Sequence, residues 1–261
     1  MTWPFSVLDD LGLSYSTRVT PAGLPYAGFQ LSDEETASVP LTLIAEDATL
    51  RLTAHDVQPS FSAEQLLLIN RRLPLARAYL QPADGTTEVA LSLFLGSSRL
   101  SSDQMGVLLG HLLDSYRVVT GQLASPITRP VLPGTADVRA EQLIAAFARR
   151  GDQLLQNGRD VAVEADLGDS GRRCRLAGWA GTGWVMATAQ FLPSPLVPPV
   201  LATLQRLQLW TRAGRFTVDD TGRLAAEVAT PALDDSVEAL AEWTVAQATL
   251  MLQVAMRHLS S

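Results

Sequence analysis

The chain of 261 residues contains no lysine: its 20 basic residues are all arginine, against 27 acidic residues. The formal net charge is −7, and neither half has an excess of positive charge. Residues 1–130 hold 8 Arg and 13 acidic residues, and residues 131–261 hold 12 and 14. Proteins that bind phosphate backbones do so with concentrated positive charge. The charge balance therefore argues against direct binding of nucleic acid.

Cysteine and long apolar runs are also scarce. Cys174 is the single cysteine, so no disulfide can form within the chain, as is usual in a reducing cytoplasm. Residues 1–5 lack a basic segment followed by an apolar run, so we expect no signal peptide. No apolar stretch approaches the roughly 18 residues that a membrane span needs. We expect a cytoplasmic protein without membrane contact.

Histidine is almost absent, and the common catalytic motifs are missing. His55, His111 and His258 are the only histidines, and none has a second His or a Cys at metal-ligand spacing. A zinc site needs four converging ligands, or three and a water. There is no Gly-x-Ser-x-Gly turn, and no Gly-Lys-Ser/Thr follows the glycine-rich segment 178–184. We expect no metal, no cofactor and no catalytic residue.

Two acidic triplets, Asp169-Ser170-Gly171 and Asp220-Thr221-Gly222, resemble those that aspartic proteases bring together. Both fall between expected strands, where Asp and Gly ordinarily form turns. The turn interpretation is therefore favoured. The alternative that stays open is a small-molecule enzyme with an acid site built from Asp166, Asp169 and Asp220.

Apolar residues make up 47% of the chain, enough for a sizeable core. Their spacing predicts that each half contains a helix, about three strands, a helix, a hairpin and a long helix. In the first half we expect helices at 3–11, 62–73 and 102–123, a hairpin at 12–31, and strands at 40–45, 49–54, 76–81 and 88–95. In the second half we expect helices at 140–155, 198–209 and 237–258, and strands at 160–165, 174–179, 183–190, 214–218 and 223–228.

The two halves repeat the same order at a similar spacing. Their hairpin turns, at Asp84-Gly85 and Asp220-Thr221-Gly222, lie about 137 residues apart, as expected for two copies of one unit. Three prolines and a glycine in residues 124–135 are typical of a linker. The sequence predicts a tandem duplication of one α+β unit: residues 1–125, a linker at 126–136, and residues 137–261.

The segment Ile69-Asn70-Arg71-Arg72-Leu73-Pro74-Leu75-Ala76-Arg77-Ala78-Tyr79-Leu80 is followed by Asp84-Gly85, a strand from Val89 to Leu95, and Ser102-Asp103-Gln104 before a Leu-rich helix. This arrangement resembles the bacterial YbjN family, putative sensory transduction regulators that are similar in structure to type III secretion chaperones. The resemblance covers about residues 60–120. The second half matches less closely: Leu204-Gln205-Arg206-Leu207 takes the place of the Asn-Arg-Arg-Leu stretch.

The resemblance implies helices packed on antiparallel sheets, a non-enzymatic protein-binding role and frequent dimers. We therefore expect a chaperone-like module that holds a partner protein in the cytoplasm and has a regulatory role, as the family description implies. A second copy of the chain, in a homodimer, is a further expected partner. The alternative is an accessory factor in a nucleic-acid or stress-response pathway, acting directly or through a DNA-bound partner.

Exposed Trp and Arg side chains often dominate protein interfaces. The candidate partner-binding residues are accordingly Trp179, Trp184, Trp210, Arg172, Arg173 and Arg175. The last two flank Cys174. Cations next to a cysteine can make its thiol reactive. Strand alternation instead predicts an inward, inert Cys174 between outward Arg173 and Arg175.

Overall fold

The computed structural model describes residues 4–32, 38–46, 48–58, 61–82, 84–96, 98–124, 127–166, 173–181, 183–191, 198–211, 213–218, 223–233 and 236–259. The chain divides into two compact units, Met1–Pro133 (unit 1) and Gly134–Ser261 (unit 2). Their boundary lies inside the proline-rich stretch 124–135. Each unit combines helices with an antiparallel sheet, so the two-unit α+β fold expected from the sequence is confirmed at this level.

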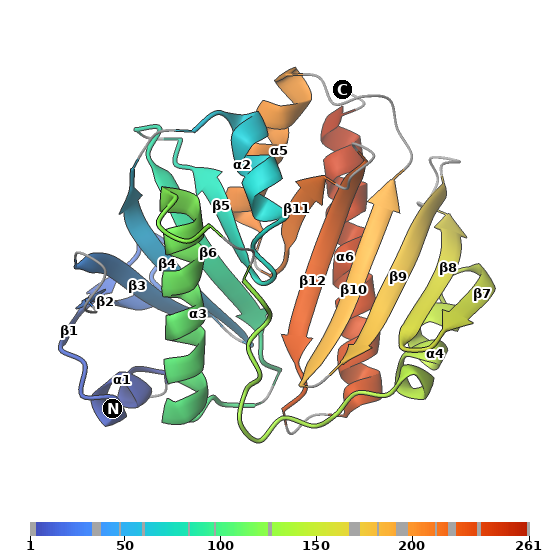
Figure 1. The fold of residues 1–261 in the computed structure, drawn as a ribbon, viewed down its shortest axis with the longest axis horizontal. Coiled ribbons are helices and arrows are strands. Elements are labelled where there is room, and N and C mark those ends of the chain that lie inside the picture. The colour runs from blue at the N-terminus through green and yellow to red at the C-terminus, as the bar shows by residue number, and fades with distance from the viewer. Residues whose placement is uncertain are drawn as a thin grey trace. The chain divides into compact units, whose positions relative to one another are not determined.

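Unit 1 has a six-stranded sheet in the order β1-β2-β3-β4-β6-β5 (Figure 1). Helix α3 lies across the sheet against β4, β5 and β6, and α1 packs against α3. The elements in chain order are α1 (Phe5–Asp10), β1 (Tyr15–Val19), β2 (Pro25–Leu31), β3 (Val39–Glu46), β4 (Thr49–Val57), α2 (Ala63–Asn70), β5 (Ala76–Leu80), β6 (Thr87–Phe94) and α3 (Ser102–Thr120).

Unit 2 has a second six-stranded sheet, in the order β7-β8-β9-β10-β12-β11. Helices α4 and α6 contact each other and pack on this sheet. The elements are α4 (Ala140–Ala148), β7 (Asp152–Asn157), β8 (Asp160–Asp166), β9 (Arg173–Gly181), β10 (Trp184–Phe191), α5 (Pro198–Trp210), β11 (Arg215–Val218), β12 (Leu224–Pro231) and α6 (Val237–Leu259).

The units share their strand register as well as their order of elements. Thr49 lies opposite Phe94 in unit 1, and Trp184 lies opposite Pro231 at the same point of unit 2. The pairs that follow along β4–β6 and β10–β12 match one for one, as far as Ala54 opposite Val89 in unit 1. Equal register assigns each residue of one sheet a counterpart in the other.

A buried amide pair recurs in both units and ties the second helix to the next strand. In unit 1, Asn70 Nδ2 donates to Ala78 O (3.2 Å) and Ala78 N donates to Asn70 Oδ1 (2.6 Å). In unit 2, Gln208 Nε2 donates to Phe216 O (2.5 Å) and Phe216 N donates to Gln208 Oε1 (2.9 Å). The counterpart of Asn70 is therefore Gln208 and not Leu204, the position expected from the sequence. Gln208 lies one helical turn further along α5, and its side-chain amide forms both hydrogen bonds with the backbone of Phe216.

Alternation on β4 separates the two faces of the first sheet. Leu50, Leu52 and Ala54 are fully buried on the face that α3 covers. Side chains at alternate positions of a strand point to opposite faces. The other face therefore carries Arg51, Thr53 and His55. Unit 1 thus has an apolar face beneath α3 and a polar face without it.

Close packing in unit 2 depends on small residues. A Cβ on Gly178 of β9 would lie 2.3 Å from the ring of Phe147 of α4, so only glycine allows this helix–strand contact. Cys174 is buried on the same strand, and Arg173 and Arg175 beside it are exposed. This is the inward thiol that strand alternation predicted.

The helix predicted at 140–155 is wrong in its second half. Helix α4 ends at Ala148, and residues 152–157 form the edge strand β7. A Cβ on Gly151 would lie 2.1 Å from the carbonyl oxygen of Glu164 on β8. The close approach of two backbones at Gly151 ends the helix and starts the strand, and helical periodicity could not reveal it.

Candidate functional site

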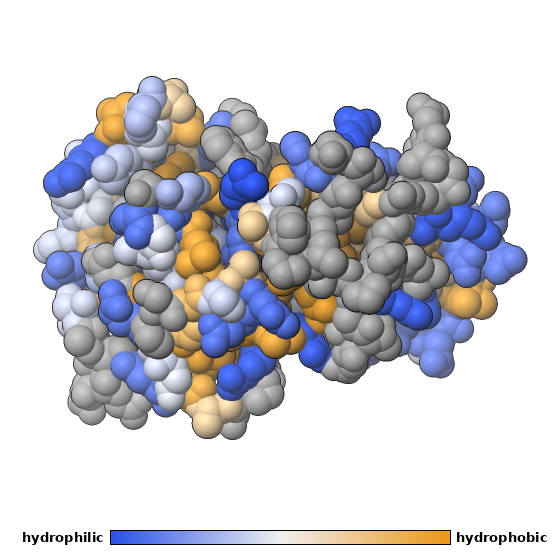
Figure 2. Space-filling view, turned by 90° about the horizontal axis from the view of Figure 1, so that it is seen from above, coloured by the Kyte–Doolittle hydropathy of each residue, from blue (hydrophilic) through white to orange (hydrophobic). Residues whose placement is uncertain are grey.

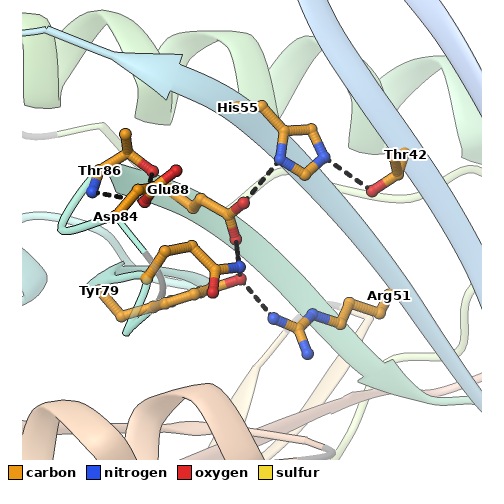
Figure 3. Close-up of polar contacts among 8 residues, drawn as sticks. Thr42, Arg51, His55, Tyr79, Asp84, Thr86 and Glu88 are labelled. Atoms are coloured by element: carbon orange, nitrogen blue, oxygen red, sulfur yellow. Dashed lines mark hydrogen bonds and ion pairs between the residues drawn. The ribbon is translucent and has the colours of Figure 1, made fainter. Parts of the chain in front are cut away.

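The polar face of the first sheet contains a hydrogen-bond network centred on Glu88 of β6 (Figure 3). The Glu88 carboxylate accepts hydrogen bonds from His55 Nδ1 (2.7 Å), Tyr79 Oη (2.7 Å) and Gln81 Nε2 (2.8 Å). Arg51 donates to the Tyr79 hydroxyl and lies with its guanidinium 5.4 Å from the ring centre. Glu88 is buried and orders side chains from β4, from β5 and from the turn after β5.

The surroundings of Glu88 stabilise its charged form. Burial alone would raise the pKa of Glu88, but hydrogen bonds from His55, Tyr79 and Gln81 together lower it below its ordinary value. Burial raises the pKa of Tyr79 to about 12, with a contribution from the Glu88 carboxylate. Tyr79 therefore remains a neutral donor and Glu88 an ionised acceptor.

The network continues from His55 to Thr42 on β3. His55 Nε2 lies 3.0 Å from Thr42 Oγ1. Because an ionised carboxylate can only accept, the Nδ1 atom that faces Glu88 must carry a proton. In the neutral imidazole the Nε2 lone pair then accepts a hydrogen bond from the Thr42 hydroxyl. Glu88, His55 and Thr42 form a chain of acid, imidazole and hydroxyl.

A pocket of about 740 Å³ opens above this chain. It is bounded by β1, β2, β3, β4 and β6 and by the turn between β5 and β6. Ser16, Arg18, Tyr26, Gly28, Phe29, Gln30, Pro40, Leu41, Thr42, His55, Gln81, Asp84, Thr86 and Glu88 line it. The volume falls in the range of small-ligand sites, about 300–1,000 Å³.

Strand β1 forms one wall of the pocket and is also the outer edge of the sheet. Thr20 N donates to Leu24 O (2.8 Å), next to the pair Val19–Pro25. Hydrogen-bonded and non-hydrogen-bonded pairs alternate in an antiparallel ladder. Thr17 and Val19 therefore direct their backbone N–H and C=O groups away from β2, toward the open edge.

The second sheet lacks the acid–imidazole–hydroxyl chain. At the positions that correspond to Thr42, His55 and Glu88 it has Ala177, Gln190 and Ala225. It carries instead a cross-strand pair, with Arg215 Nε donating to Glu227 Oε2 at 2.8 Å. The fold does not require the unit 1 network, since the second copy forms without it.

All six residues predicted to bind a partner lie in unit 2, and the structure gives those that it describes different surroundings. Trp179 is 36% exposed, whereas Trp184 is 1% exposed. Trp184 is the first residue of β10, and because its side chain is almost completely covered it offers no surface to a partner. Arg172 and the side chain of Trp210 lie outside the described residues.

The remaining predicted side chains are exposed and partly paired. Arg173 forms ion pairs with Glu164 (3.0 Å) and Asp166 (3.7 Å), and Arg175 is exposed. Burial raises the pKa of the Cys174 thiol to about 11, with a smaller contribution from Asp166, so a thiolate is disfavoured. Pairing of Arg173 with two acids leaves less positive charge for a phosphate group.

The acid site considered from the sequence is not assembled by the described residues. Asp166 is exposed and paired with Arg173, and Asp169 and Asp220 lie outside the described residues. His111 is buried in α3, and His258 is exposed at the end of α6. Among the described residues, no three His, Cys, Asp or Glu side chains come together as metal ligands.

Sequence reasoning missed His55 and Glu88. A weak signal was present, since Glu88 is the one charged residue in the otherwise apolar or uncharged strand Thr87–Phe94. A charge in such a strand needs a partner. The partners, at positions 55, 79 and 81, could be found only from the pairing of the strands.

Exposed apolar side chains are few and lie on separate elements. Val19 of β1, Leu68 of α2, Val131 between α3 and α4, Leu155 of β7 and Leu250 of α6 are each at least half exposed. On the face drawn in Figure 2, apolar and polar residues are interspersed. In the part of the chain that the structure describes, no helix is both long and apolar enough to cross a membrane.

Comparison with known proteins leaves the family open. No family model matches the chain, and no curated protein matches it. The solved structure of the di-domain ARO/CYC StfQ from the steffimycin biosynthetic pathway is 12% identical, covers 94% of this chain and 83% of its own, and has a TM-score of 0.18. That of TP0453, crystal form III, is 17% identical, with coverages of 82% and 81% and a TM-score of 0.20. TM-scores this low do not indicate a shared fold, and the YbjN resemblance stays a prediction.

Proposed function

We propose that this chain is a chaperone-like protein-interaction module that holds an extended segment of a partner protein along the edge strand β1. The observation that carries the proposal is the open edge of β1, where Thr17 and Val19 present backbone donors and acceptors. Addition of a strand at such an edge supplies affinity through main-chain hydrogen bonds, and pockets for alternate side chains supply specificity.

Strand β1 is better suited to this role than β7, an edge strand of unit 2. Exposed edge strands are usually blunted by a bulge, a proline or a lysine. Strand β7 has a register shift between Asp152 and Leu155, and Gln153 there has a φ of 55°. Strand β1 pairs with β2 without any shift and has neither proline nor lysine.

The pocket beside β1 supports the same proposal. Arg18 of β1 is exposed and forms no ion pair or hydrogen bond within the described part of the chain. A side chain of an added strand that faces the polar side of the sheet would meet Arg18 and the pocket behind it. Since the chain carries a net charge of −7, the partner segment beyond this contact is expected to be basic or neutral.

The test uses two variants of one residue. Thr17→Pro removes an outward N–H and leaves the hydrogen bonds between β1 and β2 in place, and proline is tolerated at such edge positions. Thr17→Val keeps the N–H and changes only the side chain. We expect proteins captured from a native lysate by the wild type and by Thr17→Val to be lost with Thr17→Pro, at unchanged circular dichroism and melting midpoint.

Hydrogen exchange on the captured complex tests the position directly. Binding at the edge should slow exchange at Thr17 and Val19 and leave β7 unchanged. Equal capture by both variants, or slowed exchange elsewhere, would contradict the proposal. Light scattering that gives two chains for the wild type and one for Thr17→Pro would identify the edge as a homodimer contact instead.

A further inference from the structure

The chain from Glu88 through His55 to Thr42 has the connections of a catalytic triad. A buried carboxylate holds the imidazole at 2.7 Å, and the other imidazole nitrogen lies 3.0 Å from a hydroxyl. Triads are recognised by this geometry and these roles, not by sequence order or fold. Tyr79 and Gln81 donate hydrogen bonds to the same carboxylate. The carboxylate is therefore held in place, and it orients the His55 imidazole (Figure 3).

The hydroxyl can be reached from the pocket. Thr42 is half-buried and lines the pocket, as does His55, whose side chain is 30% exposed. Gly28 lies directly opposite Thr42 on β2, so no side chain from that strand covers the Thr42 hydroxyl. A substrate in the pocket could therefore approach the oxygen atom that His55 would deprotonate.

The network is not part of the architecture common to both units. Ala177, Gln190 and Ala225 take the places of Thr42, His55 and Glu88 in unit 2 without loss of the sheet. A set of three interacting groups that one copy has and the other dispenses with is better explained by chemistry than by folding. Unit 2 also offers an internal control for any reaction of unit 1.

We propose that unit 1 has an esterase activity, beyond the interaction role above, in which Thr42 is the nucleophile and His55 the general base for small carboxylic esters. Thr42 Oγ1 forms a bond to the ester carbonyl carbon while its proton passes to His55 Nε2. The intermediate collapses, the bond to the alcohol oxygen breaks, and His55 gives the proton to the leaving alkoxide. Water then repeats the sequence on the acyl-enzyme, releasing the carboxylic acid and restoring the Thr42 hydroxyl.

Two further groups in the pocket suit the charge that develops on the carbonyl oxygen. Arg18 and Tyr26 lie opposite each other on β1 and β2, and both line the pocket. The guanidinium and phenol groups supply hydrogen-bond donors, which the tetrahedral intermediate of acyl transfer needs. Glu88 acts through His55 and is a positioning residue.

The experiment treats the whole chain with an alkyl fluorophosphonate, which transfers its phosphonyl group to an activated hydroxyl and releases fluoride. Intact mass and peptide mapping should show one adduct per chain, on Thr42 and none in unit 2. Thr42→Ser, which keeps a hydroxyl, should still acquire the adduct, and Thr42→Val should not. Thr53→Val is the matched control, because Thr53 pairs with Thr42 in register and has no part in the network.

Hydrolysis of p-nitrophenyl acetate gives the rates. His55→Ala should lower kcat about 100-fold, the usual contribution of a general base. Glu88→Gln should lower kcat at unchanged KM, whereas mere loosening of the pocket would raise KM. Absence of both adduct and hydrolysis in the wild type, or an adduct that persists in Thr42→Val, would overturn the proposal. These readouts need no partner, so they are independent of whether β1 binds one.

Discussion

At the scale of single residues, the buried Glu88 carboxylate holds together side chains from strands β4 and β5 and from the turn after β5. It accepts from His55, Tyr79 and Gln81, and each of these donors would lose its acceptor if the carboxylate were removed. A buried donor without a partner costs more than the bond itself contributes. Glu88 is therefore important for stability whatever reaction or ligand the pocket serves.

Glu88→Gln is expected to lower the free energy of unfolding at pH 7 by about 1–3 kcal/mol. The pKa of Glu88 is depressed in the folded chain, so its contribution is fully present above the unfolded pKa and is lost as pH falls through the folded pKa. Urea unfolding of wild type and variant at pH 7 and pH 3 should show a difference that shrinks at the lower pH. A difference independent of pH would contradict this assignment.

The amide pairs allow the same change to be made once in each unit. Asn70→Ala and Gln208→Ala should each cost about 2 kcal/mol, because each leaves a buried backbone N–H and C=O without their side-chain partner. Denaturant midpoints measure the effect, with the exposed Asn157→Ala as control. Two variants indistinguishable from that control would show that the amide pairs do not stabilise the units.

At the scale of elements, helix α3 depends on its N-terminal cap. Ser101 Oγ accepts from Gln104 N (3.2 Å), and the Gln104 side chain returns a hydrogen bond to Ser101 N (2.9 Å). Ser101 and Ser102 are adjacent in the sequence, and a serine is a favoured residue at a helix N-cap. The structure selects Ser101, whose extended backbone (φ −76°, ψ 167°) places its hydroxyl over the first turn.

Ser101→Ala should therefore lower the free energy of unfolding by about 1 kcal/mol, and Ser102→Ala, one residue later, by much less. Thermal or urea unfolding of both variants provides the measurement. Equal losses would mean that the capping box does not operate in solution.

At the scale of the whole molecule, charge argues against a direct nucleic-acid role. The chain has a net charge of −7, and Arg173 in the most basic segment is paired with Glu164 and Asp166. We expect no mobility shift of duplex DNA at about 0.15 M salt. A shift that weakens steeply with salt and disappears in Arg175→Ala would favour the accessory-factor alternative over the interaction module.

The sequence by itself determined the order of the elements that it predicted, the division into two similar units, and the inward side of β9 at Cys174. These follow from local periodicity, turn residues and spacing, which neighbouring residues carry. It missed β7, because the end of α4 depends on the approach of Gly151 to β8. It also placed its candidate binding residues in unit 2, where Trp184 proved to be buried.

Only the tertiary structure decided which polar groups meet. Thr42, His55 and Glu88 come from three strands, and their contact depends on the strand order β3-β4-β6 and on register. A shift of one residue would turn each side chain to the other face of the sheet. Register is set by how whole strands pair, so neither the network nor its absence from unit 2 could be read from local sequence.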